Sequence, residues 1–175
     1  MKKKILLTGR PGCGKATLIR RVAKNLPQRA AGFYTEEIRD RGARVGFRLV
    51  TLEDNDAVLA HLDFKTPERL GKYGLDLFAL EPVAVPAVRG AVQVRQLVVI
   101  DEIGPMEICS AIFRDVVNEA LDSEVQLLAT IFARSLPFTN AIKSRSDVLL
   151  IEVRPNNRDR LISELSEGIQ ALNRG

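Results

Sequence analysis

The sequence lacks several features that would point to particular compartments or cofactors. Its only two cysteines, Cys13 and Cys109, do not have the spacing of a metal site and have no disulfide partner except each other. No apolar stretch approaches the ~20 residues of a membrane span, since the longest lies near residues 125–131. The basic residues 1–4 precede an apolar segment that is too short for a signal-peptide core. We therefore expect a cytoplasmic protein, with no membrane partner and with free thiols.

Composition adds little about binding partners. The chain of 175 residues is 46% hydrophobic and 27% charged and has no low-complexity segment, so we expect a single globular domain covering residues 1–175. Its net charge of +4 is modest and spread along the chain, which does not favour nucleic acid as a partner. His61, the only histidine, is remote from the motifs described below and receives no role.

Strands and helices alternate along the chain. Apolar runs predict buried strands at residues 4–8, 97–100, 125–131 and 148–153. Helical spacing of apolar residues predicts helices at residues 18–26, 83–95, 108–121 and 157–172. Pro27 is expected to end the first helix, and Pro82 and Pro86 to lie near the first turn of the second. The inner face of the third includes Ile112, and Asn156 is expected to cap the fourth. Residues 32–39 and 44–52 predict a β-hairpin around residues 40–42, whereas residues 53–80 predict loop with short elements. This order indicates an α/β fold with a mainly parallel sheet.

The strongest motif follows the first strand and precedes the first helix. It consists of Gly9, Arg10, Pro11, Gly12, Cys13, Gly14, Lys15, Ala16 and Thr17. Glycines let successive backbone N–H groups point inward, and the helix N-terminus adds partial positive charge, as a triphosphate requires. Lys15 is expected to reach the β- and γ-phosphates, so the segment predicts a nucleotide-binding phosphate loop. A dinucleotide-binding loop is excluded because Thr17 stands where its third glycine belongs.

Ala16 departs from the phosphate-loop pattern. A serine or threonine normally follows the lysine, because its hydroxyl binds Mg²⁺, and a methyl group cannot do so. Thr17 is expected to face the α-phosphate instead. We expect nucleotide binding to persist with Mg²⁺ held more loosely, through a substituting water.

An acidic pair ends the strand at residues 97–100. Asp101 has the placement of a Walker B aspartate, which serves Mg²⁺, and Glu102 is expected to orient and deprotonate the attacking water. The alternative is that both residues cap the next element. Glu107 is a weaker candidate, since an acidic residue there also suits the helix dipole, and Thr130 is either a ligand of the water or phosphate or an ordinary strand residue.

Three arginines, Arg39, Arg48 and Arg134, are candidates for supplying charge to the transition state. The alternative for each is a solvated surface arginine.

These motifs resemble a known family, the small P-loop nucleoside-triphosphatases first described from thermophiles, whose human relative is called cancer-related nucleoside-triphosphatase. The resemblance rests on the loop at residues 9–15 and on the segments at residues 32–39, 46–48, 71–74, 101–107, 129–131 and 157–159. The loop is shared by a very large superfamily, whereas the string Thr35-Glu36-Glu37 and the segment ending at Glu107 are far more specific. Three residues depart from the family pattern, where relatives carry threonine, lysine and histidine: Ala16, Pro105 and Phe132.

The resemblance implies slow, Mg²⁺-dependent hydrolysis of nucleoside triphosphates, ATP and GTP among them, to diphosphate and phosphate with little base selectivity. It implies a three-layer P-loop fold of the RecA-like type, with the Walker B strand separated from the first strand by another strand. Carried over, residues 9–17 bind phosphates, Lys15 and Glu102 are catalytic and Asp101 serves the metal. It also draws attention to Glu36 and Arg39, without fixed roles.

Two other functions remain open from the sequence. A nucleotide or small-molecule kinase shares the same loop but needs a basic lid, and residues 53–80 contain only Lys65, Arg69 and Lys72 as basic candidates. A nucleotide-binding module with little turnover is compatible with Ala16. Whichever of these functions holds, nucleoside-triphosphatase included, we expect the protein to be a monomer.

Overall fold

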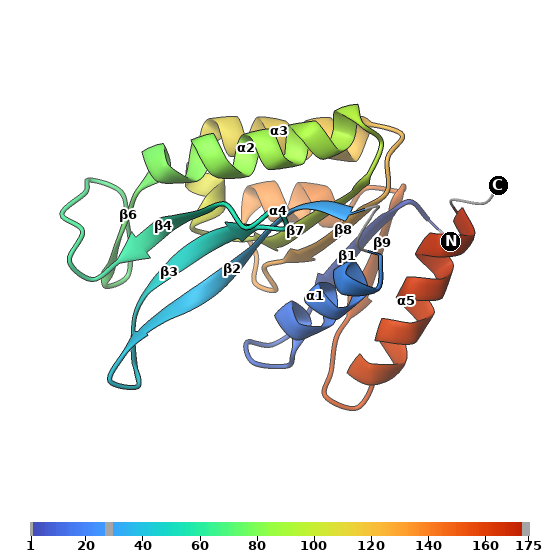
Figure 1. Cartoon of the computed structure of the whole chain (residues 1–175), viewed down its shortest axis with the longest axis horizontal. Helices are drawn as coiled ribbons and strands as arrows, with labels where there is room; N and C mark the ends of the chain where they lie inside the picture. The colour runs from blue at the N-terminus through green and yellow to red at the C-terminus, as the bar shows by residue number, and fades with distance from the viewer. Residues whose placement is uncertain (1, 27–29, 173–175) are drawn as a thin grey trace.

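The computed structural model describes residues 2–26 and 30–172, and within them nine strands form one sheet in the order β5-β6-β4-β3-β2-β7-β8-β1-β9 (Figure 1). The strands are β1 (Lys4–Thr8), β2 (Ala30–Asp40), β3 (Ala43–Thr51), β4 (Asp56–His61), β5 (Arg69–Leu70), β6 (Tyr73–Leu75), β7 (Leu97–Ile103), β8 (Leu127–Ile131) and β9 (Val148–Glu152). The helices are α1 (Lys15–Asn25), α2 (Leu77–Gln93), the short 3₁₀ turn η1 (Glu107–Cys109), α3 (Ala111–Asp122), α4 (Pro137–Lys143) and α5 (Arg158–Leu172).

The five strands β2, β7, β8, β1 and β9 are parallel, which confirms the predicted α/β class. Strand β8 lies between β1, which precedes the phosphate loop, and β7, which carries the acidic pair near its carboxyl end. The two strands are therefore separated by one strand, as the resemblance implied. In parallel sheets the carboxyl ends of all strands meet at one edge, and ligands bind outside that edge. The sheet therefore brings the two motifs to the same side of the molecule.

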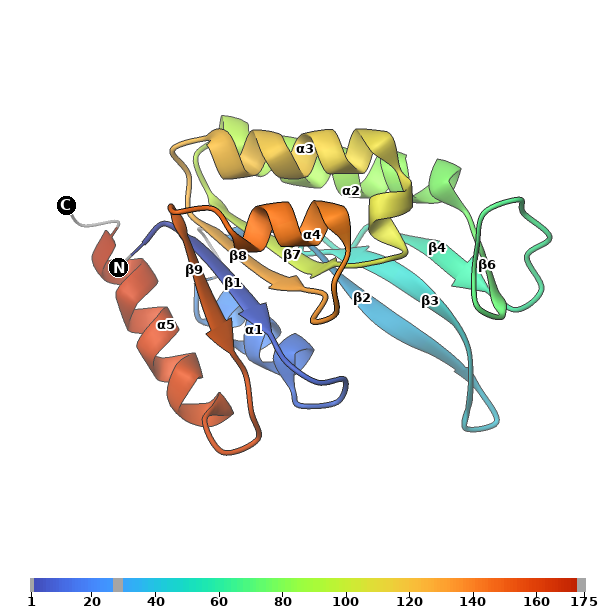
Figure 2. The ribbon, with the colours of Figure 1, turned by 180° about the vertical axis from the view of Figure 1, so that it is seen from behind.

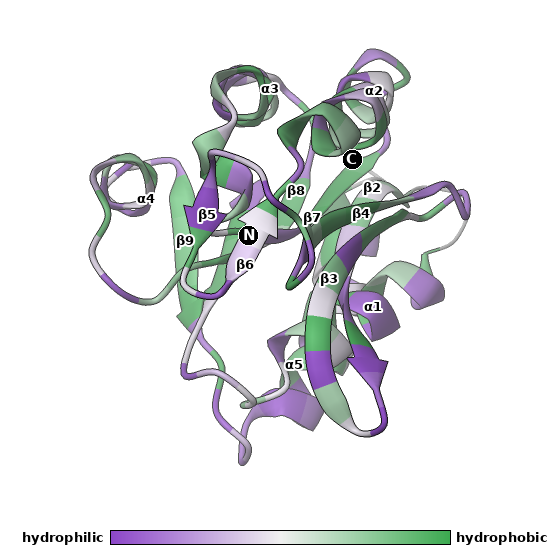
Figure 3. Cartoon of the chain, turned by 90° about the vertical axis from the view of Figure 1, so that its left-hand side faces the viewer, coloured by the Kyte–Doolittle hydropathy of each residue, from purple (hydrophilic) through white to green (hydrophobic). Residues whose placement is uncertain are grey.

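Helices cover both faces of the sheet. Helices α2, α3 and α4 lie on one face, and α1 and α5 lie on the other (Figures 1 and 2). Two apolar clusters fill the layers, one built on α2 and α3 around Phe33 and Phe113, the other on α1 and α5 around Leu18 and Leu165. The central strands are correspondingly hydrophobic along their length (Figure 3). No helix among the described residues is both long and apolar enough to span a membrane.

The hairpin of β2 and β3 extends the sheet beyond its parallel part (Figure 1). Both predicted strands and the turn at residues 40–42 are present. Residues 53–80, predicted as loop with short elements, contain the short strands β4, β5 and β6, and β4 pairs with β3 and β6. This antiparallel extension carries one side of the candidate site.

The start of α2 was predicted wrongly. The helix begins at Leu77, six residues before the predicted start at Val83, and contains both Pro82 and Pro86 in its interior. The Asp76 carboxylate accepts a hydrogen bond from the Ala79 N–H at 3.0 Å and caps the helix. Burial of one apolar face, including Leu80, outweighs the hydrogen bonds that the prolines remove.

Two other details differ from prediction. Ile112 is 47% exposed. The other residues predicted for the inner face of α3 are buried, namely Phe113, Val116, Val117, Ala120 and Leu121. Helix α5 begins at Arg158, and the preceding Asn157 accepts a hydrogen bond from the Arg154 N–H, so Asn157 rather than Asn156 anchors this turn. The predicted helix end at Pro27 lies outside the described residues.

Candidate active site

The segment between β1 and α1 forms a tight loop. Gly9 requires the absence of a side chain, because a Cβ there would lie 2.5 Å from the carbonyl oxygen of Val153. Gly14 has φ +97°, a left-handed conformation that L side chains rarely adopt, and directly precedes α1. The glycines thus shape a loop that ends at a helix N-terminus, where anions are stabilised.

Lys15 folds back over this loop. Its ammonium group donates hydrogen bonds to the carbonyl oxygens of Gly9 at 3.0 Å and Arg10 at 3.3 Å. Arg10 itself is exposed, and Cys13 is buried beneath the loop. The loop therefore holds one fixed positive charge where phosphate oxygens are expected.

The loop forms one wall of a cavity of about 480 Å³. Its lining comes from the loop, the β2–β3 hairpin, the end of β7 and the residue after β8: Pro11, Gly12, Gly14, Lys15, Ala16, Thr17, Thr35, Glu37, Phe47, Asp101, Glu102, Pro105, Met106, Glu107 and Phe132. The structure thus brings Lys15, Asp101, Glu102 and Glu107 to one pocket. All three positions that depart from the family pattern line it as well.

Asp101 is nearly buried, at 6% exposure, and its geometry is fixed by neighbouring strands. Its Oδ1 accepts a hydrogen bond from the Thr130 hydroxyl on β8 at 2.5 Å, and its carbonyl oxygen accepts one from the Thr35 hydroxyl on β2 at 3.0 Å. Burial raises the pKa of Asp101, while the Thr130 hydrogen bond and the charges of Arg20 and Lys15 lower it. Thr130, considered in the sequence as a possible ligand of water or phosphate, therefore orients this carboxylate.

Glu102 is half-buried beside two lysines. Burial raises its pKa, and the positive charges of Lys15 and Lys143 oppose that shift. Lys143, at the end of α4, also donates to the carbonyl oxygens of Ala133 and Arg134, both at 3.3 Å. A carboxylate with a raised pKa beside fixed cations suits a general base.

Glu107 is more deeply buried than the other two carboxyl groups, at 1% exposure. Burial raises its pKa to about 8, and the negative charge of Glu102 adds to that shift. The structure places it in the 3₁₀ turn η1, ahead of the first turn of α3, which begins at Ala111.

The candidate arginines lie outside the pocket lining. Arg48 pairs with Glu36 at 2.8 Å, and Arg39 pairs with Glu37 near the tip of the hairpin. Arg134 is exposed after β8. His61 lies on β4 and accepts a hydrogen bond from the Asp63 N–H, also away from the pocket.

Sequence reasoning missed two cations near the site, Lys143, whose charge acts on Glu102, and Arg158, which lies over the loop. Lys143 was overlooked because α4 was not predicted, and nothing in its local sequence marks it. Arg158 at the start of α5 lies over the loop, since a Cβ at Gly14 would be 2.6 Å from its Cδ and 3.2 Å from its Nη1. The segment 157–159 supported the family resemblance but gave Arg158 no role.

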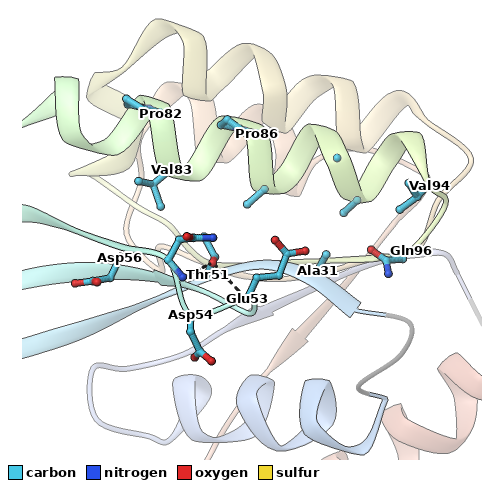
Figure 4. A pocket seen from close by; sticks show the side chains of 14 residues that line it. Ala31, Thr51, Glu53, Asp54, Asp56, Pro82, Val83, Pro86, Val94 and Gln96 are labelled. Atoms are coloured by element: carbon cyan, nitrogen blue, oxygen red, sulfur yellow. Dashed lines mark hydrogen bonds between the residues drawn. The ribbon is translucent and has the colours of Figure 1, made fainter.

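A larger cavity of about 780 Å³ lies between α2 and the turn after β3 (Figure 4). Its floor is formed by apolar residues of α2 such as Pro82 and Val83, and its rim carries the carboxylates of Glu53, Asp54 and Asp56. Among the described residues that line it there is no lysine or arginine. Its carboxylates would repel a triphosphate, so the smaller pocket at the loop is the candidate site.

Known proteins share both the sequence and the fold. Residues 4–166 match the model of a family described as NTPase. The chain is 48% identical to the nucleoside-triphosphatase THEP1 of Thermotoga petrophila, covering 93% of this chain and 90% of that protein, and 44% identical to that of Thermotoga maritima, covering 98% of each.

Two solved structures are similar over nearly their full length. The crystal structure of THEP1 from Aquifex aeolicus superposes with a TM-score of 0.85 at 37% identity, covering 93% of this chain and 96% of that one. The solution structure of a human cancer-related nucleoside triphosphatase superposes with a TM-score of 0.83 at 34% identity, covering 96% and 97%.

Proposed function

The chain belongs to the nucleoside-triphosphatase family and is an enzyme of that class, and from this premise we propose that Lys15, Asp101 and Glu102 carry the hydrolysis. The observation that supports the proposal is their convergence, with the loop amides, on one pocket of about 480 Å³. Nucleoside triphosphates such as ATP and GTP are the substrates, with diphosphate and inorganic phosphate as products. We further propose that the chain acts as one catalytic domain and as a monomer, with the phosphate loop and the acidic pair carried by one continuous sheet.

Lys15 and the amides of residues 9–17 bind the phosphates. Phosphoryl transfer needs little covalent chemistry from a protein, so catalysis consists of positioning and of stabilising negative charge. Lys15 contributes its ammonium group, and the N-terminus of α1 contributes aligned N–H groups. Arg158, which lies over Gly14, adds a third source of positive charge at the loop.

Glu102 directs the attacking water. Its carboxylate accepts a proton from that water while Lys15 and Lys143 hold it in the ionised form against the effect of burial. Broad base selectivity belongs to the proposal on the strength of the family resemblance alone.

The residues fit a magnesium ion through Asp101. Mg²⁺ is commonly held by one or two carboxylates together with substrate phosphates and waters. Asp101 offers one such carboxylate, oriented by Thr130, and the described residues contain no cluster of three or more acidic, histidine or cysteine ligands that would hold an ion alone. The ion, when bound, neutralises phosphate charge. Ala16 contributes no ligand.

The direct test measures phosphate release from ATP and GTP by wild type and Glu102→Gln. Loss of a general base is expected to lower kcat by about 10²–10⁴-fold. Glu53→Gln, a matched change in the larger cavity, is the control and should keep the wild-type rate. Equal rates for wild type and Glu102→Gln would remove Glu102 from the mechanism.

A further inference from the structure

The Glu107 carboxyl group is the least explained polar group near the site. It is 1% exposed, and its Oε1 has no hydrogen-bond partner among the described residues. Buried polar atoms are nearly always hydrogen-bonded, because an unpaired one costs free energy. An unpaired oxygen beside an active site therefore indicates a hydrogen-bond partner other than the described residues, such as a water. The carboxyl group also lines the phosphate pocket.

Glu107 and Glu102 meet above Gly104. A Cβ on Gly104 would lie 3.2 Å from Glu107 Oε2 and 3.3 Å from both Glu102 Cγ and Cδ, so the two side chains pack against the same point of the backbone. Two neighbouring carboxyl groups do not both ionise readily. Glu102 has Lys15 and Lys143 to stabilise its charge, whereas no lysine or arginine acts on Glu107 strongly enough to offset its burial. Glu107 is therefore the group that stays neutral.

The two oxygens of Glu107 have different surroundings. The backbone N–H groups of Gly104 and of Glu107 itself face the carboxyl group, and Oε2 is the oxygen next to Gly104. An oxygen that faces N–H donors acts as an acceptor, so the proton belongs on Oε1. A hydroxyl at Oε1 needs an acceptor, and no described residue hydrogen-bonds to this oxygen. Glu102, whose Cγ and Cδ lie at Gly104 next to the Glu107 carboxyl group, is the neighbouring carboxylate that one bridging water could reach.

We propose that Glu107 is a positioning residue whose neutral carboxyl group donates a hydrogen bond to one water that bridges to Glu102, and so orients Glu102 toward the attacking water. The inference rests on the proposed function, since it assigns Glu107 a role only through Glu102. Glu107 keeps its proton throughout. The bridging water hydrogen-bonds to one oxygen of the Glu102 carboxylate, and the other oxygen remains free to accept the proton of the attacking water.

The experiment compares Glu107→Gln with Glu107→Leu by steady-state turnover of ATP and by thermal unfolding. Glutamine retains an uncharged group that donates a hydrogen bond, so it should keep at least about a third of kcat. Leucine removes the donor and should lower kcat by about 10–100-fold with KM within about twofold of wild type, because Glu102 is then misplaced while nucleotide contacts remain. The leucine variant should melt no lower than wild type, because it also removes an unpaired buried oxygen. If leucine is not accommodated, Glu107→Met provides the same comparison with an unbranched side chain.

A purely structural role predicts a different pattern, in which lower turnover follows a lower melting temperature. Equal loss of kcat in Glu107→Gln and Glu107→Leu would overturn the inference, as would wild-type turnover in Glu107→Leu. In a Glu102→Gln background, Glu107→Leu should cost no further activity, because both changes affect one unit. Wild-type turnover of Glu102→Gln alone would instead refute the proposed function, so the two failures are distinguishable.

Discussion

Replacing Ala16 by threonine tests how the altered phosphate loop affects metal use. Ala16 is the second residue of α1 and lines the same pocket as Asp101, so a hydroxyl at this position would face the expected metal site. Loss of a group that supports a metal typically costs 10–100-fold in affinity or activity, so Ala16→Thr should raise turnover at limiting Mg²⁺ by roughly 10–100-fold. Threonine is a poorer helix former than alanine by about 0.5 kcal/mol, which for a chain of this size lowers Tm by about 1–2 °C.

The matched control is Ala16→Val, which has the shape and the β-branch of threonine but no hydroxyl. It should show the same small loss of Tm and no gain in turnover. The assay is phosphate release from ATP across a magnesium titration, with the three proteins side by side. If valine raises turnover as much as threonine, or if neither does, the missing hydroxyl is not what limits the enzyme and the reasoning about Ala16 is refuted.

Three further predictions follow from individual contacts. Thr130→Val removes the 2.5 Å hydrogen bond to Asp101 and should raise the pKa of that carboxyl group further. We expect activity to fall by about 10–100-fold and the acidic limb of the pH–rate profile to move to higher pH. An unchanged profile would contradict the orienting role of Thr130. Burial raises the pKa of Glu107 above its unfolded value to about 8. The contribution of this group to the free energy of unfolding is therefore fully present below about pH 4.5 and is lost as pH rises to about 8. Denaturant unfolding measured between these pH values should depend less on pH in Glu107→Gln than in wild type, and equal dependence would refute this assignment. Gly14→Ala requires a Cβ 2.6 Å from Arg158 at a positive φ, so nucleotide affinity measured by calorimetry should fall at least about tenfold, and wild-type affinity would show that the loop adapts.

The parallel part of the fold is predictable from sequence because its inner strands β1, β7 and β8 are buried on both faces. Such strands appear as continuous apolar runs, as in residues 97–100, and no polar alternation obscures them. The antiparallel extension is harder, because β4 to β6 are short and are stabilised by pairing with distant residues rather than by a local pattern. Helix α4 has only seven residues, too few to show helical periodicity.

Helix α2 shows why the positions of the prolines in the sequence predict the wrong first residue for this helix. Pro82 and Pro86 normally mark a first turn, and that placement is correct when no tertiary contact opposes it. Here Leu80, Ala84, Val85 and other residues of one face are buried against the sheet, which makes continuation of the helix through both prolines favourable. Such burial depends on residues far away in sequence and is invisible in a local window.

The candidate site divides in the same way. Lys15, Asp101 and Glu102 are recognisable because each belongs to a motif at the carboxyl end of an apolar strand, with a spacing that reflects its chemistry. Lys143, Arg158 and the proton assigned to Glu107 depend on where separate segments meet in space. Thr130 is intermediate, since its position at the end of β8 suggested a role, but only the register between β7 and β8 shows that it contacts Asp101.

The charges of the pocket explain why Ala16 should weaken metal use without abolishing it. The carboxyl groups of Asp101 and Glu102 lie near the positive charges of Lys15, Arg20 and Lys143, and a bound triphosphate brings a large excess of negative charge into this partly buried site. A divalent cation is attracted mainly by that excess and by Asp101, both of which are independent of residue 16. The hydroxyl that Ala16 lacks is a neutral ligand, and water supplies the same kind of oxygen at the cost of ordering it. The affinity for the ion should therefore fall while its requirement persists, so Ala16→Thr should shift the magnesium concentration for half-maximal turnover far more than the turnover at saturating magnesium.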